Sequence, residues 1–335
     1  MILSLCIPTY NRADDLKNSL KRINAQLIRL DECMVHMIEV RVLDNFSSDN
    51  TELICKKFSS ESRSKFSYQK NPKNIGFDGS IAKLYSDSEG EYVWFISDDD
   101  EIIEGKIKCI LDILKLHKPD LCYANVAVEG QQPRAINNQI TNLTHFPRSN
   151  CSVKLTTDSL IYFANNLERL AHIRLCSFIS ACVIKKDVKI ISRLPNFIGT
   201  GLMQDAIMNL SLRIGSSAYL PSNPIVISGS KDYVSEWFVH SVLFGALHLY
   251  SSNSLENRDC LNRIISIDSC RFGLMVLANR RRKNVMYPVN IKLLYKLIQE
   301  HGIYTACMLK ELFLAFFPWL YEFYKTNRTH IRGYK

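Results

Sequence analysis

The sequence predicts an α/β fold, a mostly parallel sheet flanked by helices, followed by a mainly helical C-terminal region. Short apolar segments alternate with segments of helical periodicity over the first hundred residues, and polar turns follow the apolar segments. Helical patterns prevail from residue 231 onward. The 335 residues are 47% hydrophobic and 22% charged, which excludes a disordered or collagen-like chain.

The first strand is expected over residues 2–7, an apolar run closed by Pro8. A helix follows, with Thr9 or Asn11 as its N-terminal cap. Its apolar positions at helical spacing are Leu16, Leu20, Ile23, Leu27 and Leu30.

The same alternation continues through the first hundred residues. It predicts strand 38–43 and helix 50–58, strand 66–69 and helix 78–85, and strand 91–96. Because ligands of open α/β sheets bind at the carboxyl ends of the strands, the polar turns there are the candidate site.

The polar segment 129–152 reads as a loop or a boundary. Beyond it the pattern predicts helix 154–169, strand 177–184 and helix 203–213. No internal repeat is present.

Charge is distributed unevenly. Residues 271–335 carry 12 Lys and Arg against 3 Asp and Glu, which is the whole formal charge of +9. Residues 306–324 form a broad apolar helical face interrupted by Pro318, and basic residues flank it. This tail predicts docking on an anionic membrane surface, and a helix packed on the catalytic domain is the alternative. No nucleic-acid-binding motif accompanies the charge.

The hydrophobicity pattern, the N-terminal residues and the spacing of the cysteines bear on where in the cell the protein is expected. No run of 18 uncharged apolar residues and no signal-peptide pattern occurs, so a cytoplasmic protein is expected. The 11 cysteines are irregularly spaced with no Cys-x-x-Cys pair, which favours reduced, packed thiols.

Asp98, Asp99 and Asp100 follow a buried strand. Adjacent carboxylates raise one another's pKa unless a cation or a hydrogen-bond donor offsets them. A divalent cation such as Mg²⁺ or Mn²⁺ would do so, with water and substrate phosphate completing its shell. A solvated acidic turn or a helix start is the alternative.

Two further turns have polar or glycine residues suited to a ligand. Asp44 could accept a hydrogen bond from a base or ribose, although capping of its own turn is the simpler reading. Gly76 and Gly79 precede a helix and suit close approach of the backbone to a phosphate. The chain has neither a Gly-x-Gly-x-x-Gly fingerprint nor a P-loop.

Four motifs lie in order along the chain: SLCIPTYNR at 4–12, VLDN with SSDNT at 42–51, NIG at 74–76 and GEYVWFISDDD at 90–100. Together they resemble the family 2 glycosyltransferases of GT-A (Rossmann-like) fold. Within the family the chain is similar to bacterial transferases of O-antigen and other surface polysaccharides, including abequosyltransferase-like members.

The resemblance implies a nucleotide-sugar site and a metal. Asp98 to Asp100 match the family's Asp-x-Asp element, which holds the cation on the diphosphate. Ser97 replaces its usual first Asp, so whether Asp98 or Asp99 joins Asp100 at the metal stays open. The implied nucleotide-sugar contacts are Pro8, Thr9, Tyr10, Arg12, Asp44, Asn74, Gly76, Asp78, Asp98 and Asp99.

The resemblance also implies a catalytic base. Residues 203–207 match the family's Glu-Asp helix, with Gln204 in place of Glu and Asp205 as the base. An amphipathic helix with Asp205 on its polar side is the alternative. The implied domains are a catalytic domain at 1–230, with a nucleotide-sugar half at 1–128 and an acceptor half at 150–230, and a basic helical region at 231–335.

The expected activity is metal-dependent sugar transfer from a nucleotide-sugar to a hydroxyl of a polyprenyl-linked oligosaccharide, with inversion as the family default. We expect it on the inner face of the cytoplasmic membrane, without a nucleic-acid partner. A sugar nucleotidyltransferase and a non-catalytic membrane scaffold are the alternatives. The first would need a Gly-rich N-terminal loop, which is absent, and the second leaves the retained Asp residues unexplained.

Overall fold

The computed structural model describes residues 1–124, 126–128, 151–154, 179–199, 201–215, 217–221 and 225–228. The chain divides into two compact units, residues 1–232 and 233–335, and all described residues belong to the first. The helices expected from residue 231 onward, including 306–324, lie outside the described residues. So does the helix expected at 154–169, except Lys154, which ends a strand.

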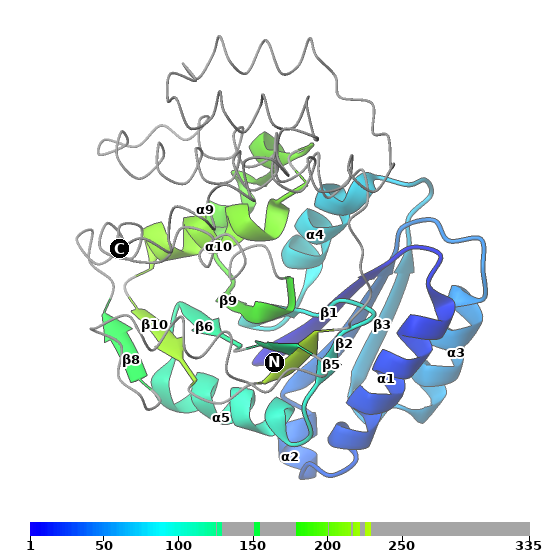
Figure 1. The fold of residues 1–335 in the computed structure, drawn as a ribbon, viewed down its shortest axis with the longest axis horizontal. Coiled ribbons are helices and arrows are strands. Elements are labelled where there is room, and N and C mark those ends of the chain that lie inside the picture. Colours follow the sequence, from blue (N-terminus) through cyan, green and yellow to red (C-terminus); the bar gives the residue numbers. More distant parts are fainter. Residues whose placement is uncertain are drawn as a thin grey trace, which may run out of the picture. The chain divides into compact units, whose positions relative to one another are not determined.

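A mixed sheet forms the centre of the first unit (Figure 1). Within the described residues it has eight strands in the order β3-β2-β1-β4-β9-β6-β10-β8. The strand pairings make six of them parallel, with β9 and β8 reversed. The bounds are β1 Leu3–Thr9, β2 Ile38–Asp44, β3 Lys65–Lys70, β4 Tyr92–Phe95, β6 Leu121–Tyr123, β8 Cys151–Lys154, β9 Cys182–Lys185 and β10 Ser217–Leu220. The predicted mostly parallel sheet is confirmed.

A smaller sheet contains β5 (Glu101–Ile102), β11 (Val226–Ser228) and β7 (Val126–Val128), with β11 in the middle. β5 directly follows the acidic turn. Its pairing with β11 ties that turn to a segment more than a hundred residues later.

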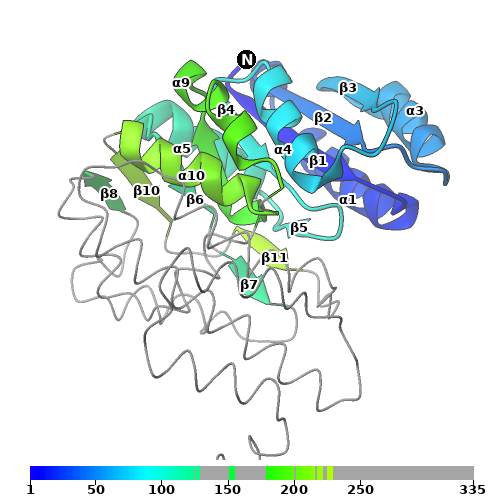
Figure 2. The ribbon, with the colours of Figure 1, turned by 90° about the horizontal axis from the view of Figure 1, so that it is seen from above.

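Helices lie on both faces of the main sheet (Figure 1). α1 and α3 lie on one face, and α4 and α10 lie side by side on the other (Figure 2). The helices are α1 Ala13–Leu27, α2 Glu32–Val35, α3 Thr51–Glu61, α4 Gly76–Asp87, α5 Lys106–His117, α9 Val188–Ile191 and α10 Met203–Ile214, with 3-10 turns η1 Ile179–Ala181 and η2 Leu194–Phe197.

Two local expectations were wrong, and one helix was not expected. Neither Thr9 nor Asn11 caps α1, because the Ala13 N–H donates to Asp49 of the next loop at 2.9 Å. The strand expected at 177–184 begins only at Cys182, after the turn η1. The helix α5 was not anticipated, although Ile107, Ile110, Leu111 and Leu114 are buried at helical spacing.

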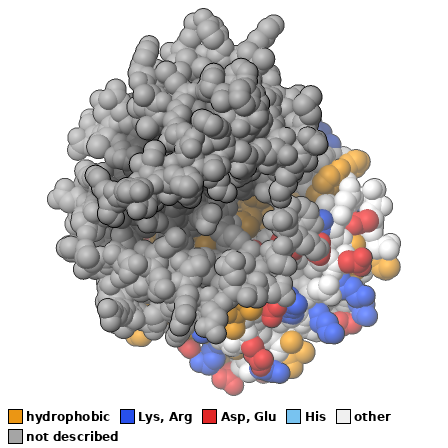
Figure 3. Space-filling model, in the orientation of Figure 1, with side chains coloured by type: hydrophobic (Ala, Val, Ile, Leu, Met, Phe, Trp, Pro, Cys, Tyr) orange, Lys and Arg blue, Asp and Glu red, His pale blue; other side chains and the backbone are white. Residues whose placement is uncertain are grey.

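The described surface mixes both signs of charge. On the described part of the face in Figure 3, Lys and Arg side chains lie among Asp and Glu. Exposed pairs such as Lys56 with Glu52 at 2.6 Å and Lys57 with Glu61 at 3.8 Å lie along α3. Among the described residues, no helix is long and apolar enough to cross a membrane.

The order of the strands locates the site. The chain moves outward from β1 to β3 and then returns to place β4 on the other side of β1. The loops that leave β1 and β4 therefore diverge at adjacent strand ends, where ligands bind in open α/β sheets. The Ile96 N–H donates to Cys6 O at 2.9 Å, which holds these two ends in register.

Candidate functional site

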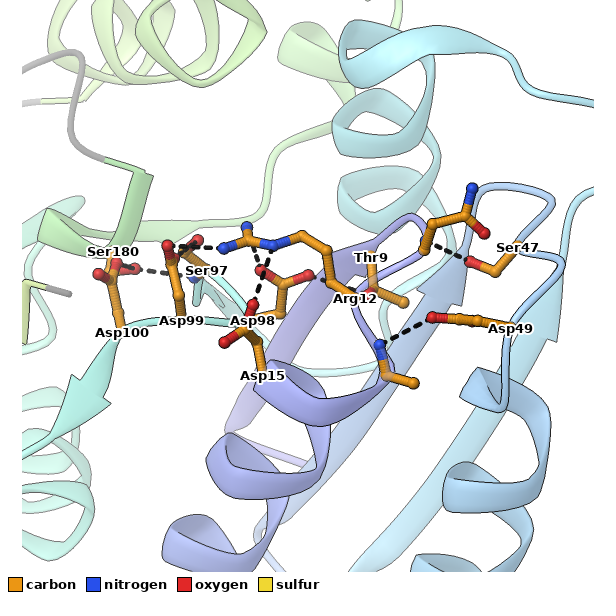
Figure 4. Close-up of polar contacts among 12 residues, drawn as sticks. Thr9, Arg12, Asp15, Ser47, Asp49, Ser97, Asp98, Asp99, Asp100 and Ser180 are labelled. Atoms are coloured by element: carbon orange, nitrogen blue, oxygen red, sulfur yellow. Dashed lines mark hydrogen bonds and ion pairs between the residues drawn. The ribbon is translucent and has the colours of Figure 1, made fainter. Parts of the chain in front are cut away.

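Arg12 joins the ends of β1 and β4 (Figure 4). One guanidinium nitrogen lies 2.5 Å from Asp98 Oδ1 and another 2.7 Å from Asp99 Oδ2. Thr9, the last residue of β1, donates its hydroxyl to Asp98 Oδ2 at 2.9 Å. Four residues that the sequence assigns to one site are thus in direct contact.

Asp98 and Asp99 differ in their ionisation. Burial raises the pKa of Asp98 to about 6, although Arg12 and Thr9 oppose the shift. Burial also acts on Asp99, but hydrogen bonds from Ser97 and Arg12 outweigh it and lower the pKa of that carboxyl. Asp99 is therefore the more strongly ionised of the two at neutral pH.

Asp100 is bound on its other side by a residue that the sequence analysis missed. Ser180 in η1 donates its hydroxyl to Asp100 Oδ2 at 2.6 Å and accepts the Ser97 N–H at 2.9 Å. The Trp94 indole N–H donates to Ser180 O at 2.9 Å, so the buried strand β4 fixes this serine. A single serine in an apolar segment has no sequence signal that reveals this contact.

The three aspartates fit a divalent cation delivered with a diphosphate. Within the described residues, no group of three or more His, Cys, Asp or Glu is gathered as a cation cage. Mg²⁺ at phosphate sites needs only one or two carboxylates, because water and phosphate oxygens supply the rest. Of Asp98 and Asp99, Asp99 has the more exposed side chain, 16% against 3%, and its contact with a cation stays a prediction.

The loops after β1 and β2 are tied together. The Asn11 N–H donates to the Ser47 hydroxyl at 2.8 Å, and the Ser48 N–H donates to Asn11 Oδ1 at 2.8 Å. Asn11 and Phe46 have positive φ angles of 52° and 75°. Non-glycine residues in this conformation are enriched at functional sites. Tyr10 and Phe46 lie in these loops and are 46% and 51% exposed.

The Asp44 carboxylate is directed toward other groups of the protein rather than toward solvent. It is fully buried, and its oxygens accept the Ser47 N–H at 2.7 Å and the Tyr68 hydroxyl at 2.8 Å. The turn-capping alternative therefore describes its present contacts. A further hydrogen bond to a nucleotide stays a prediction.

Asn74 and Gly76 shape the loop before α4. Asn45, which follows β2, donates to Asn74 Oδ1 at 2.7 Å and accepts the Ile75 N–H at 2.9 Å. Gly76 has a φ of 76°, which glycine adopts without strain. Pro8 lies within β1. Contacts of these residues with a nucleotide stay predictions.

Asp205 lies in the first turn of α10 and is 3% exposed. Burial, and then the charge of Asp78, raise its pKa well above the ordinary value of 3.8. A carboxyl with a raised pKa is a stronger base once ionised, which is what a general base requires. Gln204, beside it, is equally buried.

Asp78 approaches α10 from α4. Its carboxylate accepts the backbone N–H groups of Gly199, Gly201 and Met203 at 2.8, 2.7 and 3.1 Å. The structure thus places Asp78 at the start of α10, and its predicted contact with a nucleotide is not tested.

Comparison with known proteins shows which family and fold this chain shares. The curated relative abequosyltransferase RfbV of Salmonella typhimurium (strain LT2) is 28% identical over 195 residues, 56% of this chain. The alignment covers 54% of RfbV, so the chain spans about half the length of that relative.

Solved structures share the fold. Residues 1–349 of S. aureus TarS align with a TM-score of 0.55 at 16% identity, covering 94% of this chain and 81% of that one. TarS has also been solved with UDP-GlcNAc. Mannosyltransferase PcManGT from Pyrobaculum calidifontis, in complex with GDP-Man and Mn²⁺, aligns with a TM-score of 0.50 at 13% identity and covers 96% and 87%.

The family model described as Glycosyl transferase family 2 matches residues 4–181. The match begins within β1 and ends with η1, so it includes Arg12, the three aspartates and Ser180. It covers more than half of the chain and confirms the predicted family. This chain belongs to glycosyl transferase family 2.

Proposed function

We propose that this protein transfers a sugar from a nucleotide-sugar to a hydroxyl group of a lipid-linked oligosaccharide in surface-polysaccharide synthesis. The observation that carries the proposal is the meeting of Arg12 and Thr9 with Asp98 and Asp99 at the point where the strand order reverses. The names of RfbV and the TarS complex with UDP-GlcNAc support the same class of reaction.

The donor would bind across the ends of β1 and β4. Thr9, Arg12 and the tied loops after β1 and β2 line this edge, and the exposed rings of Tyr10 and Phe46 could stack on a base. Arg12 can contact a phosphate by the same charge-assisted geometry with which it now binds Asp98 and Asp99.

A divalent cation would be held by Asp99 and Asp100, with Asp98 kept in place by Thr9. When bound, Mg²⁺ or Mn²⁺ neutralises the negative charge that develops on the leaving nucleoside diphosphate. Ser180 orients Asp100, and Ser97 orients Asp99 by donating its hydroxyl at 2.5 Å. The PcManGT complex with Mn²⁺ supports this part of the proposal.

Asp205 would act as the base. Its carboxylate takes the proton of the acceptor hydroxyl while that oxygen forms a bond to the anomeric carbon. The bond between that carbon and the diphosphate oxygen breaks, and its electron pair leaves with the nucleoside diphosphate. Attack from the face opposite the leaving group inverts the anomeric configuration.

The acceptor is proposed to be polyprenyl-linked and reached on the inner face of the cytoplasmic membrane. The support is the apolar, aromatic segment 306–324, which is flanked by Lys and Arg residues. Flotation of wild-type and Phe316/Phe317→Ser proteins with anionic liposomes tests this part. Equal flotation of both proteins would contradict membrane docking by this segment.

The test of the function is a donor screen. UDP-, GDP-, CDP- and dTDP-linked sugars are titrated calorimetrically with and without Mn²⁺, and the products formed with lipid-linked acceptors are identified by mass spectrometry. The proposal expects tight binding of one nucleotide class only with Mn²⁺, and release of a nucleoside diphosphate on transfer.

Other results would favour the alternatives. Release or consumption of pyrophosphate would indicate a nucleotidyltransferase. Absence of binding by every donor would indicate a scaffold. Either result would contradict the proposed function.

A further inference from the structure

Asp78 binds backbone that lies more than 120 residues away in the chain. Its Oδ2 accepts the N–H groups of Gly199 at 2.8 Å and Gly201 at 2.7 Å, and its Oδ1 accepts the Met203 N–H at 3.1 Å. Asp78 is in the first turn of α4 and is 5% exposed. One buried carboxylate therefore takes three N–H groups at the N-terminal end of α10.

The turn that Asp78 binds depends on glycine. Gly199 and Gly201 have φ angles of 92° and 70°, which are strained for residues with a Cβ atom. A Cβ at Gly199 would meet nothing within 4 Å, so at this position the requirement is conformational rather than steric. Backbone N–H groups that converge in such turns form an anion-binding concavity. Here the anion is a side chain of the protein itself.

This turn leads directly to Asp205. Met203 is the first residue of α10, and Asp205 follows within the same turn. Because the rise and rotation per helical residue are fixed, the position of the first residue sets the position of Asp205. An error of about 1 Å at a reacting group can cost about 100-fold in rate.

We propose that Asp78 is a positioning residue of the transfer reaction, which holds Gly199, Gly201 and the first N–H of α10 so that Asp205 meets the acceptor hydroxyl. This inference rests on the proposed function, since it takes Asp205 as the base. It assigns Asp78 to the acceptor side rather than to the nucleotide.

The charge of the Asp78 carboxylate also contributes to the raised pKa of Asp205. Asp78 faces it from α4, and the buried thiol of Cys182 faces it from β9, where burial and Asp205 raise the pKa of the thiol. Lys189 of α9 and Arg193, next to η2, are exposed to solvent. Among the described residues, Asp78 is the charged group that raises the pKa of Asp205.

Asp78→Asn tests both effects, because it removes one acceptor oxygen and the charge. Hydrogen exchange at Gly199, Gly201 and Met203 should accelerate about tenfold. The kcat of transfer should fall about 10 to 100-fold, with the Kd of the donor unchanged. The acidic limb of the kcat profile should move to lower pH, because loss of a nearby negative charge favours the ionised form of Asp205.

Two further variants separate position from charge. Gly201→Ala strains the turn but leaves the charge, so kcat should fall while the acidic limb stays in place. It also keeps the proposal testable if Asp78→Asn does not fold. Asp187→Asn is the matched control, because Asp187 caps α9 by accepting the Lys189 N–H at 2.6 Å and does not contact the turn. Its pH profile should equal that of the wild type.

Unchanged exchange at Gly199, Gly201 and Met203 in Asp78→Asn would overturn the inference, and so would an unmoved acidic limb in that variant. Full kcat in Gly201→Ala would overturn it as well. The exchange measurement needs no sugar transfer. Failure of the wild type to transfer from any donor would therefore overturn the proposed function separately, and the role of Asp78 with it.

Discussion

Two clusters each hold a buried aspartate, in different ways. Asp98, at the β4 end, is offset by the guanidinium of Arg12, and Asp78, between α4 and α10, is offset by three backbone N–H groups. At the first cluster the pKa of Asp99 is lowered, and beside the second the pKa of Asp205 is raised. Burial raises the pKa of Asp205, as it does that of Asp98, and only at Asp99 do hydrogen bonds outweigh it.

Asp100→Asn should have the largest effect. The amide oxygen can still accept the Ser180 hydroxyl, so the fold is kept, but the charge needed by a cation is lost. We expect metal-dependent nucleotide-sugar turnover to be abolished, with thermal stability near that of the wild type. Turnover and Mn²⁺ affinity are the measurements. Full activity would remove Asp100 from the cation site.

Asp205→Asn should reduce sugar transfer without affecting donor binding at the cluster of Arg12, Asp98 and Asp99. Loss of the base should reduce transfer by about 10² to 10⁴-fold while donor binding is spared. Transfer is measured by product formation and donor binding by calorimetry, with Asp187→Asn as the control. If donor affinity falls as much as transfer does, the separation of the two clusters is contradicted.

Arg12→Met should leave the buried Asp98 carboxylate without its positively charged side-chain partner. The free energy of unfolding should fall by about 1–3 kcal/mol, because a buried acceptor loses its charged partner. Adding Asp98→Asn should recover most of this loss, since the uncompensated charge is then gone. Urea denaturation of the two single variants and the double variant gives the coupling. Additive losses would show that Arg12 does not stabilise Asp98.

Ser180→Ala should have the smallest effect. It removes the donor to Asp100 and the acceptor of the Ser97 N–H, and we expect a loss of about 1–2 kcal/mol in unfolding free energy. Mn²⁺ affinity should fall about tenfold, because residues that orient a cation ligand contribute at that level. A variant with unchanged Mn²⁺ affinity would restrict Ser180 to a structural role.

Much of the fold could be predicted because its signals are local. The apolar runs that became β1, β2 and β4 alternate with helical periodicities, and each is bounded by its own polar turn. The caps were not predictable in the same way. The N–H of Ala13 is satisfied by Asp49, and a contact between two loops leaves no periodicity in the chain.

The candidate site likewise contains some residues that the sequence indicates and others that it does not. Three consecutive aspartates after a buried strand are visible in the sequence, because like charges placed together need an offsetting group. Ser180 and the partners of Asp78 are not visible. They lie 80 to 125 residues from the side chains they contact, and neither a serine nor a glycine indicates such a partner.

The sequence by itself determined the alternation of strands and helices and the edge where polar residues gather, because those properties depend on side-chain type and spacing within a few residues. The resemblance to a known family named the candidate cation ligands and the candidate base, and their roles stay predictions. Only the tertiary structure decided that Arg12 is the counter-charge of Asp98 and Asp99, and that Asp78 serves α10. The ionisation of each carboxyl depends on burial and on groups brought near it by folding, and neither is encoded locally.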